Sequence, residues 1–430
     1  MSFLNNKVVK NAGWLIFGKI GQMLISLLVG VFTARYLGPA NYGLINYASA
    51  YTAFFMAFCT LGINALLVKE FIDSPENEGV VLGTSLLLRT ISSMLSAIVI
   101  ICFVSIVDAG EPITITVVAL SSVGVVFHVF EIFNFWFQAR LQSKISAITS
   151  LIAYFITAVY KILLLVFGKG VEFFAFATSV DYICIAVILM FMYFRFGGAK
   201  LKFSLNYGKS LLKRSYHFIF SAIMIAVYGQ TDKLMLKQIL GESETGYYAT
   251  AMTICNMWSF VLAAIIDSMH PSIMEVNGKD EILFKKKNRQ LYCIVFYISV
   301  FVSIGLVLFA PIIIKILYGN DFLPSISPLR IITWYTAFSY LGAARNAWIV
   351  CKNKQKYLKF IYFGAAVLNV LLNLLLIPYF GASGAAFASL MAQIVSSIIL
   401  PLFIKPLREN SILMIEAILL KGIKNRNNNS

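Results

Sequence analysis

Twelve apolar runs, each long enough to cross a membrane as a helix, follow one another along this chain of 430 residues. A helix needs about 20 mostly apolar residues to span a hydrocarbon core of roughly 30 Å. The sequence therefore predicts an all-α integral membrane protein. We expect its transmembrane helices at residues 12–34, 43–66, 82–107, 113–137, 146–167, 172–194, 215–238, 246–268, 290–316, 328–350, 358–378 and 383–405.

The composition excludes a soluble protein. Hydrophobic residues make up 60% of the chain and charged residues 13%, and the mean hydropathy is +0.83. Soluble domains contain about 45–50% apolar and about 25% charged residues. A transmembrane barrel would show strands of alternating polarity, which this sequence lacks. The six cysteines are scattered singly, so we expect no disulfide framework and no metal site.

Lysine and arginine are distributed very unevenly between alternate loops. With the N-terminus in the cytoplasm, 25 basic residues fall in cytoplasmic segments and only 2, Arg35 and Lys169, in external loops. Because positive charge is retained on the cytoplasmic side, we expect both termini to be cytoplasmic. This asymmetry explains the net charge of +16 without a nucleic-acid partner.

The sequence contains an internal repeat. LGPANYGLINYASA at 37–50 aligns with LGESETGYYATAMT at 240–253, and AFAT at 175–178 aligns more weakly with AFAS at 386–389. Each copy of the longer motif joins the first two helices of a six-helix half. We therefore predict two six-helix bundles related by a pseudo-twofold repeat, at 1–205 and 206–405, and a cytoplasmic tail at 406–430. Transporters built from repeats place their site at the repeat interface.

Several basic residues lie inside the expected spans, where a charge is costly. Lys19, Arg89, Lys233 and Arg345 lie too deep to reach the interface easily. Lys161 lies in the outer half of its span, where it could face either the interface or a cavity. We expect the four deep cations to face a water-filled cavity or an ion pair rather than lipid.

The acids within the spans are fewer: Glu131, Asp181 and Asp232 are the principal ones. In the fourth expected span His128, Glu131 and Gln138 share one helical face, and a polar stripe of this kind faces protein or water. These acids are candidates for proton or cation coupling, although Asp232 could serve only as the partner of a basic neighbour.

The excess of buried basic residues favours an anionic cargo, because Arg and Lys are natural partners of phosphate oxygens. The sequence has no GxxxxGK[ST] loop, so ATP is not expected to drive transport directly. No catalytic constellation is present either. We therefore expect a transporter that is not an enzyme and uses no cofactor.

Three stretches resemble one known family. They are NAGWLIFGKIGQMLISLLVGVFTARYLGPANYGLINYA at 11–48, GQTDKLMLKQILGESETGYYATA at 229–251 and IIIKILYGNDFLPS at 312–325. These stretches, the number of spans and the loop pattern resemble the Wzx-type polysaccharide flippases. Those flippases belong to the multidrug/oligosaccharidyl-lipid/polysaccharide exporter superfamily. The resemblance implies two six-helix bundles arranged as in multidrug and toxin extrusion transporters, with a central cationic cavity.

The resemblance also implies a function. The chain would move an undecaprenyl-diphosphate-linked O-antigen or capsule repeat unit from the cytoplasmic to the periplasmic leaflet of the bacterial inner membrane, coupled to an ion gradient. Lys19, Arg89, Lys161, Lys233 and Arg345 are then the expected contacts of the diphosphate or of acidic sugars. Membrane lipids, and an O-antigen polymerase and chain-length regulator, are the further partners to consider.

Two other functions compete with this reading. A multidrug and toxin extrusion antiporter would need acids in its first bundle, where span 12–34 offers Lys19 and no acid. An O-antigen polymerase or ligase would need a large periplasmic loop, whereas the longest external loop here has about a dozen residues. Lipid II flippases of the same superfamily usually have about fourteen spans, and the twelve expected here argue against that branch.

Overall fold

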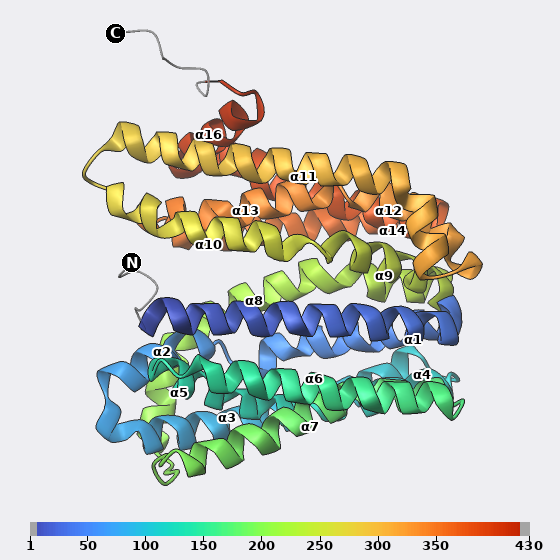
Figure 1. Ribbon diagram of the computed structural model, residues 1–430, viewed down its shortest axis with the longest axis horizontal. Coiled ribbons are helices and arrows are strands. Elements are labelled where there is room, and N and C mark those ends of the chain that lie inside the picture. The colour runs from blue at the N-terminus through green and yellow to red at the C-terminus, as the bar shows by residue number, and fades with distance from the viewer. Residues whose placement is uncertain (1–6, 422–430) are drawn as a thin grey trace. The chain divides into compact units, whose positions relative to one another are not determined.

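The computed structural model describes residues 7–421, apart from the side chains of residues 7–12, 15–17, 19, 24, 65, 217 and 221. All regular structure in this range is helical (Figure 1). The chain forms two compact units, residues 1–230 and 231–430, called unit 1 and unit 2 below. The boundary falls inside helix α8 (Leu205–Leu240), whereas the sequence suggested a boundary at 205, where α8 begins.

Unit 1 is built from long helices joined by short turns. Its elements before α8 are α1 (Lys7–Cys59), α2 (Asn64–Asp73), η2 (Pro75–Asn77), α3 (Glu78–Val107), α4 (Pro112–Phe127), η3 (His128–Glu131), α5 (Ile132–Ala139), α6 (Ser143–Val166) and α7 (Val171–Arg195). Helix α1 packs along α6, and α7 packs against both α4 and α6 (Figure 1). Helices α1, α6 and α7 therefore each turn one face toward the other two inside the unit.

Unit 2 begins with the end of α8. Its further elements are α9 (Glu242–Asn256), α10 (Ser259–Val276), α11 (Glu281–Leu317), η4 (Asn320–Ser325), α12 (Ile326–Ile332), α13 (Tyr335–Cys351), η5 (Gln355–Tyr357), α14 (Leu358–Ile394), the π-helical turn η6 (Val395–Ile399), α15 (Leu400–Phe403), η7 (Lys405–Leu407) and α16 (Arg408–Ile418). Helix α11 packs against α10, α13 and α16, and α14 packs against α9, α12 and α13.

Two of the long helices are each two spans joined at a glycine. Gly38 interrupts α1 with φ 72° and ψ 172°, and Gly381 interrupts α14 with φ 53° and ψ −135°. Gly241, the repeat partner of Gly38, has nearly the same backbone angles, φ 95° and ψ −175°. A positive φ of this size favours glycine. The repeated LG motif therefore makes the same sharp turn in both units.

Eight segments among the described residues are long and apolar enough to span a membrane. Two of them contain the breaks at Gly38 and Gly381 and so hold two spans each. The two remaining expected spans correspond to α8, which carries several charges, and to α12 with α13, where α13 alone has 17 residues. The protein is a multi-pass, all-helical membrane protein.

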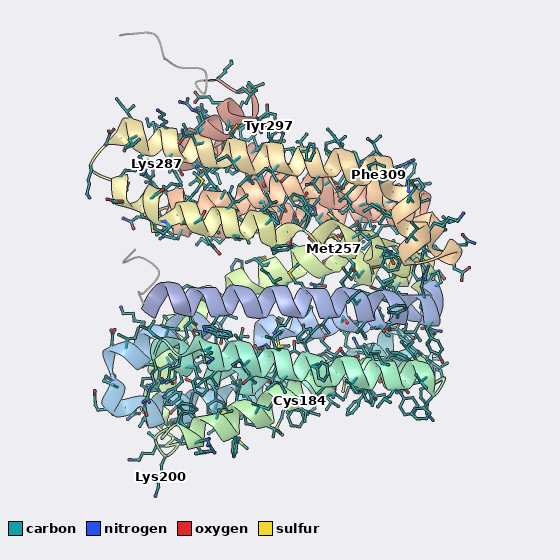
Figure 2. The ribbon with its side chains drawn as sticks, in the orientation of Figure 1. Cys184, Lys200, Met257, Lys287, Tyr297 and Phe309 are labelled. Atoms are coloured by element: carbon teal, nitrogen blue, oxygen red, sulfur yellow. The ribbon has the colours of Figure 1, made fainter. Side chains whose placement is uncertain are left out.

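The side chains are arranged for lipid on the outside. On α11, Phe301, Leu308, Phe309 and Ile312 are all more than half exposed, and Figure 2 labels Phe309 on that face. The buried positions instead hold many small residues, including Ser299 and Ser303 of the same helix. Membrane helices pack through such small residues because lipid provides no hydrophobic force to drive helices together.

Ion pairs tie the helix ends that we expect on the cytoplasmic side of unit 1. Glu70 of α2 accepts from Arg214 Nη1 at 2.5 Å and from the Tyr207 hydroxyl at 2.9 Å. Although burial raises the pKa of Glu70, these hydrogen bonds and the charge of Arg214 bring that pKa below its ordinary value. The segment after α7 lies against α3, where a Cβ on Gly83 would meet the carbonyl oxygen of Lys202 at 2.4 Å.

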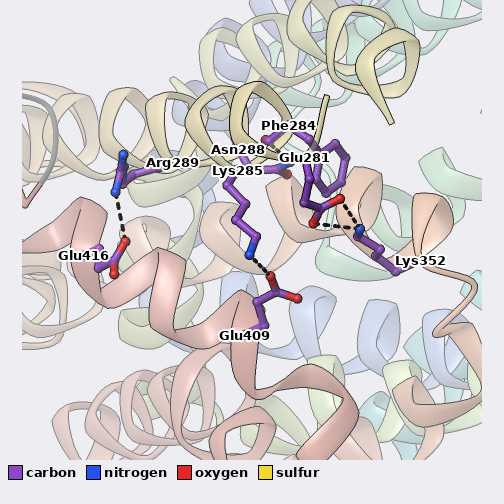
Figure 3. Close-up of polar contacts among 8 residues, drawn as sticks. All are labelled: Glu281, Phe284, Lys285, Asn288, Arg289, Lys352, Glu409 and Glu416. Carbon is purple, nitrogen blue, oxygen red and sulfur yellow. Dashed lines mark hydrogen bonds and ion pairs between the residues drawn. The ribbon is translucent and has the colours of Figure 1, made fainter. Parts of the chain in front are cut away.

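Unit 2 has comparable pairs, drawn in Figure 3. Helix α16 is joined to α11 by Lys285–Glu409 at 2.7 Å and Arg289–Glu416 at 3.0 Å. The expected tail at 406–430 thus contains a packed helix: Leu413 and Met414 of α16 belong to the buried cluster of unit 2. Residues 422–430 of that tail lie outside the described residues.

Candidate functional site

Arg89 of α3 is fully buried in unit 1. Its Nη1 donates to the amide oxygen of Asn64 at 3.1 Å, and its Nη2 lies 3.3 Å from His128 Nδ1. Its Nε has no hydrogen-bond partner among the described residues. The guanidinium is therefore held by an amide and an imidazole and keeps one donor unused, at a depth where an unpaired charge is costly.

His128 connects this arginine to a carboxylate. Its Nε2 lies 3.1 Å from Glu131 Oε2. Both residues belong to η3, a short 3-10 turn that interrupts the span formed by α4 and α5, and such interruptions often mark functional hinges. Arg89, His128 and Glu131 form a chain whose net charge is close to zero when the imidazole is neutral.

A cavity of about 170 Å³ lies inside unit 1 among α1, α6 and α7. Lys161 and Asp181 both line it, with polar neighbours that include Tyr154, Thr157 and Thr178. Asp181 Oδ1 is buried without a hydrogen-bond partner among the described residues. Lys161 and Asp181 are not joined by an ion pair in the described part of the chain. Both charges are thus available to a guest in the cavity.

Asp232 of α8 is the centre of a buried polar cluster in unit 2. Oδ1 accepts from the amides of Asn369 at 3.0 Å and Asn373 at 2.6 Å. Oδ2 accepts from the Tyr248 hydroxyl at 2.5 Å and from the Ser389 hydroxyl. The cluster therefore surrounds one carboxylate, 3% exposed, with four side-chain donors from α9 and α14.

The amide orientations in this cluster carry chemical meaning. Asn373 Oδ1 is buried and has no partner among the described residues. The oxygen and nitrogen of an amide can be exchanged by a half-turn of the group. If Asn369 and Asn373 turned in this way, their oxygens would join the Asp232 carboxylate and two hydroxyls. Such oxygen ligands suit a hard cation. A proton on the Asp232 carboxylate is the other way to bring a positive charge into the cluster.

Lys233 follows this aspartate directly. It is partly exposed, and in the described residues it has no hydrogen bond or ion pair. Its neighbour Asp232 accepts hydrogen bonds from the four neutral donors above, and the charges of Lys233 and Asp232 attract each other. The side chain of Lys19, the remaining predicted cation, lies outside the described residues.

Arg345 of α13 is 2% exposed. Its Nη1 donates to the carbonyl oxygens of Ser396 at 3.1 Å and Ser397 at 3.3 Å, both in the π-turn η6. A π-turn leaves carbonyls without their usual helical partners, and Arg345 binds them. These partners are neutral, so the positive charge is held in place without being cancelled, while Nε has no partner among the described residues.

The cavity of unit 1 and the cluster of unit 2 occupy matching places in the repeat. At the offset of 203 Asp232 corresponds to Val29, which lines the cavity of unit 1. At the offset of 211 Ser389 corresponds to Thr178, which lines the same cavity. Both units therefore place polar groups between their first and sixth helices, although the charged residues differ.

The predicted site residues thus fall into separate groups rather than one. In unit 1 Arg89 meets Glu131 through His128, and the His128 ring packs on Tyr182 at 5.2 Å between centroids. Tyr182 lines the cavity that Lys161 shares with Asp181, so the two groups of unit 1 adjoin. In unit 2 Arg345 and Asp232 each have their own hydrogen-bond partners. Sequence analysis missed all four partners of Asp232, which are Tyr248, Asn369, Asn373 and Ser389. In the described range, no group of three His, Cys, Asp or Glu side chains could hold a metal ion.

Residues 8–277 match the family described as "Polysaccharide biosynthesis protein". The chain belongs to this family. The match spans all of unit 1 from residue 8 and continues through α9 and α10 of unit 2, so it includes Arg89, the Lys161 cavity and Asp232. The family assignment confirms the resemblance inferred from the three sequence stretches.

Known relatives cover nearly the whole chain. A protein of Escherichia coli named "Putative O-antigen transporter" is 23% identical over 92% of this chain and 96% of its own length. An uncharacterized membrane protein of Methanocaldococcus jannaschii is 21% identical, over 95% of this chain and 86% of the relative. The similarity to both relatives therefore extends over both units.

Solved structures share the fold. The lipid II flippase MurJ in an inward closed conformation has a TM-score of 0.72 at 14% identity, over 98% of this chain and 94% of that one. An inward-facing multidrug resistance transporter of the MATE family and MOP superfamily has a TM-score of 0.67 at 16% identity, over 94% and 96%. The polysaccharide biosynthesis family member described here thus has the transporter fold of this superfamily.

Proposed function

We propose that the protein flips an undecaprenyl-diphosphate-linked O-antigen or capsule repeat unit from the cytoplasmic to the periplasmic leaflet, with both termini in the cytoplasm. The family and the fold support transport in polysaccharide biosynthesis. One observation carries the proposal further: Arg345 is buried, and in the described residues its hydrogen bonds go to the neutral carbonyls of Ser396 and Ser397. Interior positive charge kept without a contacting carboxylate suits an anionic cargo.

The cations would act in two ways. Lys161 lines a cavity, and Lys233 is partly exposed without a hydrogen bond or ion pair in the described residues, so each can contact a phosphate oxygen or an acidic sugar directly. Arg345 is enclosed, so its contribution is mainly an attractive potential, which a low dielectric makes stronger than in water. Arg89 is enclosed as well, and it adds to this potential when Glu131 is protonated. Lys19 belongs to the same proposed set because of its depth in the first span.

Three acids would link transport to an ion gradient. Protonation of Glu131 would leave the chain of Arg89, His128 and Glu131 with a net positive charge and so favour an anion. Asp181, which shares its cavity with Lys161, could take up a proton or a cation. Asp232 could do the same among its four donors. Each event changes the interior charge by one unit, which is what coupling to an anionic cargo requires.

Reconstitution tests the proposal. Proteoliposomes would carry a fluorescent undecaprenyl-diphosphate-linked sugar, and an impermeant quencher would report the leaflet it occupies. We expect the wild type to move the lipid and Arg89→Gln to lose at least about tenfold in rate, equivalent to about 1.4 kcal/mol of barrier. Arg195→Gln is the matched control, because Arg195 is an exposed arginine in the last turn of α7.

A second candidate function is cation-coupled multidrug extrusion. The Asp232 cluster favours it, since oxygen-rich acidic sites suit cations, and the fold is shared with MATE transporters. The same proteoliposomes separate the two. Export of a cationic dye with no movement of the lipid-linked sugar would reject the flippase and support the antiporter.

A further inference from the structure

A second cavity in unit 1 has a different character from the first. It measures about 190 Å³ and lies among α1, α5 and the start of α6. Its polar lining consists of neutral amides and hydroxyls, from Gln22, Asn134, Gln138, Ser143, Ser146 and Ser150. The side chains described as lining it include no charged group. Figure 1 shows the start of α1, α5 and the start of α6 at the same end of unit 1.

Two polar atoms at this cavity have no hydrogen-bond partner in the part of the chain that the structure describes. Ser146, 7% exposed, has a buried hydroxyl without a hydrogen bond among the described residues, and so does the Oδ1 of Asn134. A buried polar group without a partner is destabilising. Their presence side by side at one cavity indicates that a guest with hydrogen-bonding groups completes them.

The cavity also lies on a continuous polar track. On α6, Ser143, Ser146 and Ser150 line this cavity, and one helical turn later Tyr154 begins the lining of the charged cavity with Lys161. This spacing of three and four residues keeps one helical face. On α1, Gln22 lines the neutral cavity and Ser26 the charged one. The two cavities therefore follow each other along the same faces of α1 and α6.

We propose that the neutral cavity binds one sugar ring of the lipid-linked glycan, next to the charged cavity that attracts the diphosphate. This inference rests on the proposed function. Sugar hydroxyls both donate and accept, as do the amides and hydroxyls of the lining. The volume is below the roughly 300–1,000 Å³ of sites for drug-sized molecules, so the cavity admits about one ring. Gln138 is exposed, which leaves the cavity open at that side.

The test compares two lipids that differ only in the sugar. Purified protein would be titrated with undecaprenyl diphosphate and with undecaprenyl-diphosphate-N-acetylglucosamine. We expect the wild type to bind the glycosylated lipid more tightly. Asn134→Leu should weaken binding of the glycosylated lipid about tenfold, as expected for the loss of one or two net hydrogen bonds, and leave binding of the sugar-free lipid unchanged.

Gln138→Met provides a second variant at an exposed position, should Asn134→Leu fail to fold. Gln238→Met is the control, because it removes an exposed amide in unit 2. Equal effects of the cavity variants on both lipids, or no effect, would overturn the sugar site. So would a wild type that binds the two lipids equally, although the flippase function would stand. A wild type that binds neither lipid would reject the flippase function and this inference with it.

Discussion

Replacement of Asp232 separates the charge of its cluster from its hydrogen bonding. In Asp232→Asn the amide oxygen can still accept from Asn369 and Asn373, at the position of Oδ1. The new NH₂ then points at the hydroxyls of Tyr248 and Ser389, which in the wild type donate to Oδ2. Hydroxyls can reverse their role and accept. The variant can therefore satisfy the cluster without a negative charge.

The magnitudes follow from this geometry. Asp232→Ala leaves four buried donors without their acceptor, and hydrogen bonds to charged groups contribute about 1.5–3 kcal/mol each. Tyr248 and Ser389 already lie 3.3 Å apart and can pair with each other, so the losses do not add in full. We expect Asp232→Ala to lower the free energy of unfolding by about 3–5 kcal/mol. For Asp232→Asn we expect about 1 kcal/mol.

Thermal unfolding of the purified variants, followed by tryptophan fluorescence, measures both values. On the proposed function Asp232→Asn should also remove the ion dependence of flipping while the protein remains folded. If Asp232→Asn proves as unstable as Asp232→Ala, the cluster needs the negative charge for folding, and the reasoning from reversible hydroxyls is wrong. If Asp232→Asn keeps full ion dependence, Asp232 is not the coupling group.

Three further predictions concern other parts of the molecule. Gly83→Ala should destabilise unit 1 by about 1–3 kcal/mol, measured by thermal unfolding, because its Cβ would meet a backbone carbonyl that cannot move cheaply. Hydrogen bonds from Arg214 and Tyr207 hold the pKa of Glu70 below its ordinary value. Their contribution to the free energy of unfolding is therefore present above about pH 4.5 and is lost as the pH falls through the lowered pKa. Glu70→Gln should therefore remove the contribution of Glu70, seen as a smaller fall in unfolding temperature between pH 7 and pH 3 than the wild type shows. Arg345→Lys should fold less stably than wild type, because one ammonium replaces the guanidinium at two carbonyls, and unchanged stability would show that those contacts contribute little.

The spans were predictable from sequence because their signal is local. A run of about twenty apolar residues is enough to indicate a membrane-spanning helix. The LG motif at Gly38 and Gly241 is enough to indicate a turn that needs glycine. The shorter repeat also aligned Thr178 with Ser389 from the sequence alone. Even the depth of Arg89 could be read correctly, because depth depends only on position within a span.

The partners of the buried charges were not predictable in the same way. Asp232 meets Asn373 across 141 residues and Ser389 across 157, and no helical periodicity reports such a distance. The carbonyls that bind Arg345 are exposed by a π-turn, which has no signature in the sequence around Ser396. The packing of α16 was missed because its apolar face is short and ends in a polar run.

The two units differ in how they supply positive charge to matching places, and this bears on the coupling ion. In unit 1 the position of Asp232 is occupied by Val29, and the cavity there already contains a tethered ammonium, Lys161, facing Asp181. In unit 2 the carboxylate is ringed by neutral groups, so a positive charge must arrive from outside as a proton or a metal cation. On the proposed function, Asp232 should therefore contribute more to the ion dependence than Asp181. Asp181→Asn would then change the affinity for the anionic lipid and reduce the ion dependence less than Asp232→Asn does.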